Sequence, residues 1–328
     1  MKYQIIQHQH IFAPGQQEFK QCHASNVCLL PDGSAAAVWF GGDHEKAPNV
    51  AVWFSKQKNG QWTVPVRIAV HEGIPCWNPV LLPKEDRLVL YYKMGKEIPT
   101  WQTMVKESFD FGETWGEAKE LVPGDFGGRG PVKNKCLVLK NGTILAPASV
   151  EAEYWQCFVD ISEDGGATWQ KSSLVPMDKE SLKDKGVIQP TLWEDETGVV
   201  HMFMRSSEGY IFTSESTDGG RNWSMAERTA LPNNNCGLDL AKLSDGRLVL
   251  VYNPVSGNWA ARSPIAFAVS EDNGKTFSEP QILDHVPCEK NEERAEFSYP
   301  SVVNRGNDVF LTYTWKRQTV AFWQIRIL

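Results

Sequence analysis

The middle of the chain reads Ser162-Glu-Asp164-Gly-Gly166-Ala-Thr168-Trp169. Segments that begin at Ser108, Ser216 and Ser270 repeat this order of Ser, Asp, Gly, a small polar residue and an aromatic residue. The four serines are 54 residues apart, and a degenerate copy from Ser55 to Trp62 lies 53 residues before Ser108. A fixed period of this length indicates a repeat architecture in which each repeat is one supersecondary unit.

Each copy is typical of a tight turn between two strands. The Asp can accept hydrogen bonds from nearby backbone N–H groups, the Gly can adopt a positive φ, and the aromatic residue can pack back between strands. A second series of turn residues, each followed by an apolar strand, counts the units independently. It comprises 31–33, 85–86, 140–142, 197–198, 244–246 and 306–307. The chain therefore contains six units.

The fifth unit shows the internal order of a repeat. Its strands are expected at 237–243, 247–253, 265–271 and 280–283, which is the pattern of a four-stranded antiparallel propeller blade. In the sixth unit, strands are expected at 299–304, 308–315 and 320–327, so that unit ends one strand short. Residues 3–12 are strand-like and can supply the missing strand.

We therefore predict an all-β fold, a six-bladed β-propeller with four-stranded antiparallel blades. The N-terminal strand is expected to close the ring. Six periods of 54 residues account for almost all of the 328 residues, so residues 1–328 are expected to form a single domain.

Composition excludes several classes of protein. The chain has 33 Lys and Arg against 40 Asp and Glu, and its net charge of −7 comes without a basic block, so a nucleic-acid partner is not expected. No apolar run approaches the roughly 20 residues of a membrane-spanning helix, so a membrane partner is not expected either. The first ten residues carry Gln and His where a signal peptide needs an apolar stretch, which predicts a cytoplasmic protein.

Cysteine and histidine spacing bears on metals and disulfides. The seven cysteines are spread singly along the chain, without a C-x-x-C pair. This spacing favours reduced thiols over a disulfide framework or a zinc cluster. His and carboxylate residues do not cluster at metal-ligand spacing, and we expect neither a metal nor a cofactor.

The boxes of the form S-x-D-x-G-x-T-W resemble the Asp-box, or bacterial-neuraminidase (BNR), repeats of the sialidase superfamily. The resemblance covers almost the whole chain and implies the propeller fold. It implies a structural role for the boxes, which also occur in proteins without catalytic activity. In a four-stranded blade, the start of the first strand and the end of the second lie on the face opposite the box turns. We therefore expect function on that face.

That face is rich in basic and aromatic side chains, although the net charge is negative. Converging arginines can recognise a carboxylate through paired N–H groups, and aromatic rings can form the walls of sugar subsites. The substrate-binding candidates are Arg205, Arg262, Lys133, Arg317, Asn78, Gln189, Trp39, Trp77 and Asn235, with Trp101 and Trp259 as further aromatic candidates. The catalytic candidates are Tyr299, His23, Asp43, Glu45 and Glu296.

The resemblance implies roles for several of these residues. Sialidases hold the substrate carboxylate with three arginines, and Arg205 and Arg262 fall where two of them are expected. The segment Glu296-Phe-Ser-Tyr299 is similar to the one that carries the nucleophilic tyrosine. Asp43 or Glu45 falls in the region of the aspartate that acts as acid and base.

Two positions depart from the family's pattern. The segment Cys-His23-Ala-Ser replaces one that usually carries the first-blade arginine, and Gln189 stands where a glutamate that activates the tyrosine is expected. A tyrosine nucleophile needs a nearby carboxylate to take its proton, and a glutamine cannot do so. Either Glu296 or another carboxylate takes this role, or the chemistry differs. His23 is then a candidate general acid or base near neutral pH.

Three functions are consistent with these residues. The leading one is an exo-acting glycoside hydrolase for an anionic glycan that contains sialic, ulosonic or uronic acid, in which Tyr299 or a water molecule attacks. The second is a uronide lyase, or a rhamnosyl-glucuronide-type hydrolase, that uses His23. The third is a non-catalytic carbohydrate-binding propeller. In each case the expected partner is an anionic oligosaccharide.

Overall fold

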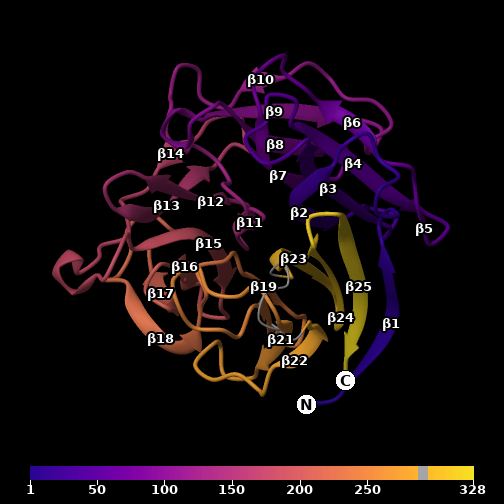
Figure 1. Ribbon diagram of the computed structural model, residues 1–328. Coiled ribbons are helices and arrows are strands. Elements are labelled where there is room, and N and C mark those ends of the chain that lie inside the picture. Colours follow the sequence, from indigo (N-terminus) through magenta and orange to yellow (C-terminus); the bar gives the residue numbers. More distant parts are fainter. Residues whose placement is uncertain (287–294) are drawn as a thin grey trace.

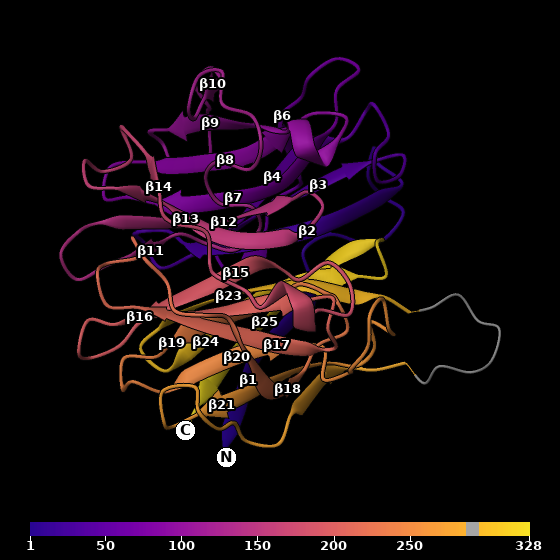
Figure 2. The same ribbon diagram turned by 90° about the vertical axis from the view of Figure 1, so that its left-hand side faces the viewer.

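A computed structural model describes residues 1–286 and 295–328, and these residues form six antiparallel sheets arranged in a ring (Figure 1). Each sheet is one blade of a propeller. In the side view the strands run across the thickness of the ring, so that they have one end on each face (Figure 2). The predicted all-β, six-bladed propeller is confirmed.

The blades follow one another along the chain. Blade 1 consists of β2 (Gln21–Leu29), β3 (Ala35–Gly42), β4 (Ala51–Lys58) and β5 (Gln61–Trp62), with β6 (Val66–Ala69) also paired to β4. Blade 2 consists of β7 (Cys76–Pro83), β8 (Leu88–Met94), β9 (Gln102–Ser108) and β10 (Lys119–Glu120). Blade 3 consists of β11 (Leu137–Val138), β12 (Ile144–Glu151), β13 (Trp155–Ser162) and β14 (Gln170–Lys171).

The second half of the ring has the same organisation. Blade 4 consists of β15 (Val187–Glu194), β16 (Val200–Ser206), β17 (Tyr210–Ser216) and β18 (Glu227–Pro232). Blade 5 consists of β19 (Asp239–Lys242), β20 (Leu248–Tyr252), β21 (Ile265–Ser270) and β22 (Gln281–Asp284). Blade 6 consists of β23 (Phe297–Arg305), β24 (Asp308–Trp315), β25 (Thr319–Ile327) and β1 (Tyr3–His10). Short 3₁₀ turns occur at Ile98–Thr100 and Lys179–Ser181.

The ring closes through its two chain ends. Strand β1 pairs antiparallel with β25, so that Tyr3 lies opposite Ile327 and His10 lies opposite Ala321. The N- and C-termini consequently lie close together, as Figures 1 and 2 show. The N-terminal strand therefore completes blade 6, as its pattern predicted.

The box turns are held by their own side chains. The Asp164 carboxylate accepts hydrogen bonds from the backbone N–H of Thr168 (2.9 Å) and from the hydroxyl groups of Ser162 (2.8 Å) and Thr168 (2.6 Å). The N–H of Gly166 donates to the Ser162 hydroxyl at 2.7 Å. The same bonds recur around Asp110, Asp218 and Asp272, with Asn222 in place of Thr in the third box.

The aromatic residue of each box packs against the neighbouring blade. The sequence predicted only that it packs between strands. Trp115 of blade 2 packs against Phe54 of blade 1, with ring centroids 5.7 Å apart. In the degenerate first copy, Trp62 lies 5.1 Å from Phe322 of blade 6. The same kind of contact therefore spans the junction between the two chain ends.

The core consists of apolar layers between blades. Between blades 5 and 6, for example, Val251 and Phe267 pack with Val302 and Leu311, and all four side chains are buried. Among the described residues, six cysteines are buried free thiols, and Cys288 lies outside those residues. None of the helices in the described part of the chain has the length and hydropathy needed to cross a membrane.

Candidate functional site

The innermost strands of most blades carry a backbone irregularity near their first residues. Pairing between the first two strands shifts just after His23, Trp77, Ile188 and Ser298. The non-glycine residues Ala24, Asn78, Gln189 and Tyr299 adopt positive φ there, and Asn235 does so just before β19. Such bulges re-aim side chains, and positive φ is strained for Ala24, Gln189 and Tyr299, whereas asparagine tolerates it. All five positions lie at the same end of their blades, which is the face predicted to carry function.

Four predicted residues form one hydrogen-bonded group, in which Arg205 and Gln189 contact the Tyr299 hydroxyl and Asn235 contacts Arg205. Arg205 donates from Nη1 to Tyr299 Oη at 2.8 Å and to Gln189 Oε1 at 3.0 Å. Gln189 donates from Nε2 to Tyr299 Oη at 3.3 Å, and Arg205 donates from Nε to Asn235 Oδ1 at 2.8 Å. Among the residues that the structure describes, no carboxylate is hydrogen-bonded to the Tyr299 hydroxyl. The groups that orient this hydroxyl are therefore an arginine and an amide.

Two further arginines converge on Glu296. Arg262 donates from Nη1 to Glu296 Oε1 at 2.6 Å, and Arg317 donates from Nε to Glu296 Oε2 at 2.8 Å. Burial acts to raise the pKa of Glu296, but positive charge from His23 when protonated, Arg262 and Arg317 holds that pKa well below its usual range. Glu296 is therefore an anion, and its carboxyl has no proton to donate at neutral pH.

The buried His23 ring packs against the ring of Tyr299. Its ring centroid is 4.2 Å from that of Tyr299, and its Nδ1 is 3.0 Å from the Thr314 hydroxyl. Burial lowers the pKa of His23 well below its usual value, and the charge of Arg317 lowers it further. The buried imidazole is therefore neutral at pH 7.

Lys133 lies close to Tyr299, with its Nζ 5.9 Å from the ring centroid, but its ammonium group is hydrogen-bonded within the protein. Lys133 is buried, and its ammonium group donates to Asn134 Oδ1 (2.7 Å), to the carbonyl of Leu238 (3.2 Å) and to the carbonyl of Pro300. These three bonds use its three donors, so Lys133 can bind a substrate carboxylate only by giving up one of them. Burial also lowers its pKa to about 8.

The predicted tryptophans near the start of the chain are core residues. Trp39 is fully buried and stacks on Phe12, with ring centroids 5.0 Å apart, which corrects the expectation that it lines a sugar subsite. Trp77 is also buried, donates from Nε1 to the Gly95 carbonyl at 2.8 Å and packs against Trp101 at 5.3 Å. Trp77 and Trp101 belong to an apolar cluster against which Tyr299 packs.

The two first-blade carboxylates have different surroundings. Glu45 accepts a hydrogen bond from Arg317 Nη1 at 2.6 Å. It thereby joins the group formed by Arg205, Arg262 and Arg317, called here the arginine cluster. Asp43 pairs with Lys20 at 3.0 Å and is exposed. The bond from Lys20 lowers the Asp43 pKa. Asn78 is buried near the start of β7 with φ 41°.

Two tryptophans flank Arg205. Its Cζ lies 5.8 Å from the ring centroid of Trp155 and 5.5 Å from that of Trp259. Trp259 is exposed and is a predicted aromatic candidate, whereas Trp155 lies in the segment 149–155 that the sequence places on this face but is not among the predicted binding residues. A signal for Trp155 was available, because it begins the strand paired with the end of β12, on the predicted functional face.

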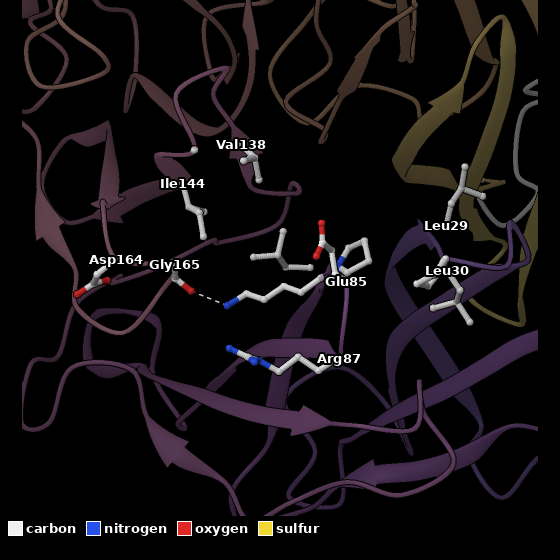
Figure 3. Close-up of a pocket in the computed structure, with 13 residues that line it drawn as sticks. Leu29, Leu30, Glu85, Arg87, Val138, Ile144, Asp164 and Gly165 are labelled. Carbon is white, nitrogen blue, oxygen red and sulfur yellow. Dashed lines mark hydrogen bonds between the residues drawn. The ribbon is translucent and has the colours of Figure 1, made fainter.

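A cavity of about 830 Å³ lies on the opposite face and is lined by strand-connecting turns (Figure 3). Its cations are already engaged, since Lys84 donates to the carbonyl of Gly165 and Arg87 pairs with Asp86 and Glu107. Lys84 follows the end of β7, whereas Asn78 lies near the start of that strand. This cavity is therefore separate from the arginine cluster.

The arginine cluster retains free donors for an anionic ligand. Within the described residues, nothing accepts a hydrogen bond from Nη2 of Arg205 or from Nε and Nη2 of Arg262. Guanidinium groups in a partly desolvated setting bind carboxylates through charge-assisted bonds. No group of three or more His, Cys, Asp or Glu in the described part of the chain is placed to hold a metal ion.

Comparison with known proteins agrees with the fold. Residues 33–311 match the family described as a BNR repeat-like domain, and no curated protein matches in sequence. A Dyadobacter fermentans protein of unknown function is similar in structure, with a TM-score of 0.77, 18% identity and 99% of each chain covered. A Hadza microbial sialidase has a TM-score of 0.81 and 16% identity, over 98% of this chain and 68% of the sialidase. The NanB sialidase of Streptococcus pneumoniae has a TM-score of 0.75 and 13% identity, over 98% and 70%.

Proposed function

Because the chain belongs to the family of BNR repeat-like domains, we propose that this sialidase-like propeller is an exo-acting glycoside hydrolase whose substrate is an anionic glycan. The observation that carries the proposal is the convergence of Arg205, Arg262 and Arg317 around Tyr299 and Glu296. Arg205 donates to a hydroxyl group and two amides, and N–H groups of Arg205 and Arg262 have no acceptor among the described residues, so a further anion can bind there. The substrate class is a glycan with a terminal sialic, ulosonic or uronic acid.

The free N–H groups of Arg205 and Arg262 would hold the substrate carboxylate. Arg205 also contacts the Tyr299 hydroxyl at 2.8 Å, so a carboxylate on this arginine brings its neighbouring carbon close to Tyr299. In sialic and ulosonic acids that neighbouring carbon is the anomeric carbon, whereas in uronic acids the ring oxygen separates it from the anomeric carbon. The geometry thus favours a sialic or ulosonic acid, with the Tyr299 oxygen or a water molecule as attacking group. Trp155 and Trp259 would flank the sugar.

The proposal is tested with a panel of 4-nitrophenyl glycosides of sialic, ulosonic and uronic acids beside their neutral sugar counterparts. We expect turnover of an acidic member and none of the neutral ones. Arg205→Ala should lose at least about 30-fold in kcat/KM, since truncating one partner of a desolvated charge pair costs about 2–5 kcal/mol. Arg326→Ala is the control, because Arg326 is an exposed residue that pairs with Asp308. Turnover restricted to neutral sugars, or an active Arg205→Ala variant, would contradict the proposal.

One observation favours a second candidate, β-elimination at a uronic acid. The partners of the Tyr299 hydroxyl are Arg205 and Gln189, with no carboxylate bonded to it among the described residues, and a tyrosine oxygen can act as the base of an elimination. Arginines on the substrate carboxylate would make the neighbouring ring proton easier to remove. Elimination creates a conjugated double bond, so a rise in ultraviolet absorbance on turnover identifies it. Tight binding without turnover of any member of the panel would instead identify a carbohydrate-binding propeller.

A further inference from the structure

Glu151 is the last residue of β12, on the face of blade 3 that looks toward Arg205. Side chains two residues apart on a strand point to the same face of the sheet. The contact of Ser149 therefore identifies the blade that the Glu151 side chain faces. The Ser149 hydroxyl accepts a hydrogen bond from the backbone N–H of Gln189 in blade 4 at 3.4 Å. Glu151 therefore projects toward blade 4, one step nearer the end of the strand.

The register of blade 3 places Glu151 beside the arginine. Glu151 lies directly opposite Trp155 in the pairing of β12 with β13, and opposed residues share a face of the sheet. The ring of Trp155 is 5.8 Å from Arg205 Cζ. Glu151 and Trp155 thus flank the guanidinium group that contacts the Tyr299 hydroxyl.

The Glu151 carboxyl differs from those of Asp43, Glu45 and Glu296. Asp43 pairs with Lys20, Glu45 pairs with Arg317, and Glu296 pairs with two arginines. The Glu151 carboxyl has no hydrogen bond or ion pair with any residue in the described ranges, and the side chain is half-buried. Burial raises its pKa, and the charge of Arg205 opposes that rise only in part. Two carboxyl groups whose pKa values are pushed apart are the usual arrangement for acid–base work.

We propose that Glu151 is the proton donor to the glycosidic oxygen, an inference that rests on the proposed hydrolase function. The carboxyl gives its proton to that oxygen as the bond to the anomeric carbon breaks, and the electron pair of the bond leaves with the departing alcohol. Water then adds to the anomeric carbon and returns a proton to the Glu151 carboxylate. The substrate gains one water molecule, and the enzyme ends as it began. Glu151 takes the role that the first-blade position of Asp43 and Glu45 was expected to fill.

The experiment compares two glycosides of the sugar acid that the wild-type protein hydrolyses. The 4-nitrophenyl glycoside releases a stable phenolate that needs no proton, whereas the methyl glycoside releases methanol, which does. With Glu151→Gln we expect kcat on the methyl glycoside to fall by about 10²–10⁴-fold, the usual contribution of a general acid. On the 4-nitrophenyl glycoside the fall should stay within about tenfold, since only the proton is lost. Glu151→Asp should recover part of the methyl glycoside rate.

Glu153→Gln is the matched control, since Glu153 is an exposed glutamate two residues further along the chain. Its rates on both glycosides should equal those of the wild type. If Glu151→Gln slows both glycosides equally, or leaves the methyl glycoside unaffected, the assignment of the proton donor is overturned while the hydrolase function stands. If the wild type hydrolyses no acidic glycoside of the panel, the function and the assignment fail together. A urea midpoint equal to that of the wild type shows that the variant is folded.

Discussion

Glu296→Gln is expected to destabilise the protein strongly. The Glu296 carboxylate accepts bonds from Arg262 at 2.6 Å, Arg317 at 2.8 Å and the Ser298 hydroxyl at 2.6 Å. Glutamine has almost the same volume, but it removes the charge that separates two guanidinium groups. Breaking a buried ion pair by removing one partner costs about 3–5 kcal/mol. Because the Glu296 side chain is 19% exposed, we expect the lower end, a loss of about 3 kcal/mol in the free energy of unfolding.

Glu45→Gln is the matched control, because Glu45 shares the partner Arg317. Its bond to Arg317 Nη1 is 2.6 Å long, but its side chain is 41% exposed. An ion pair open to solvent contributes less than about 1 kcal/mol. Urea unfolding followed by circular dichroism gives the free energies of both variants by linear extrapolation.

An anionic ligand provides a second measurement on the same variants. In Glu296→Gln the two arginines have lost their internal anion, so a sugar acid should raise the unfolding midpoint of this variant more than that of the wild type. The reasoning is refuted if Glu296→Gln loses no more free energy of unfolding than Glu45→Gln. It is also refuted if sugar acids stabilise the variant and the wild type equally.

Three further predictions concern pH, the box turns and the closing strand. Folding lowers the pKa of Glu296 below the usual 4.5, so the contribution of its carboxylate to stability is complete above that pH and is lost as the pH falls. The difference in unfolding free energy between the wild type and Glu296→Gln should therefore shrink below pH 4.5. A constant difference from pH 7 to 3 would contradict this. Both Gly112 and Gly142 have positive φ, but a Cβ at Gly112 would lie 2.3 Å from the Phe54 ring, whereas a Cβ at Gly142 would meet open space. Urea unfolding should therefore show Gly112→Ala to be less stable than Gly142→Ala by about 1–3 kcal/mol. Equal losses of stability in the two variants would rule out the clash. Deleting residues 1–12 leaves β25 as an open edge, so gel filtration should show association or aggregation, and a monomer with wild-type stability would exclude this role for β1.

The strands could be predicted closely wherever turn chemistry brackets an apolar run. The strand expected at 308–315 is β24, Asp308–Trp315, with the same bounds. The strand expected at 237–243 is shorter, Asp239–Lys242, because its pairing begins only where Asp239 faces Val251. Just before it, the side chain of Asn233 accepts backbone N–H bonds from Ser206 and Asn235 in place of a partner strand. The pattern of apolar residues does not show where a side chain such as that of Asn233 replaces a partner strand as the hydrogen-bond acceptor.

The candidate site could be predicted in location but not in detail. Arg205, Gln189, Asn235 and Tyr299 meet as one hydrogen-bonded group, although they are up to 110 residues apart in the chain. Lys133 is also a basic residue that the sequence places on the functional face, yet its ammonium group donates to the carbonyls of Leu238 and Pro300. Which way a basic side chain turns at the axis depends on neighbours from other blades.

By itself, the amino-acid sequence determined the number of blades, the closing strand and the face that carries the basic residues. The reason is that turn residues and strand periodicity act over a few residues, and a 54-residue repeat makes that local information recur around the ring. Only the tertiary structure decided which carboxyl groups are paired with arginines and that the Glu151 carboxyl has no partner within residues 1–286 and 295–328. Charge pairing and desolvation depend on distances between residues far apart in the chain, so they arise only when the six blades assemble.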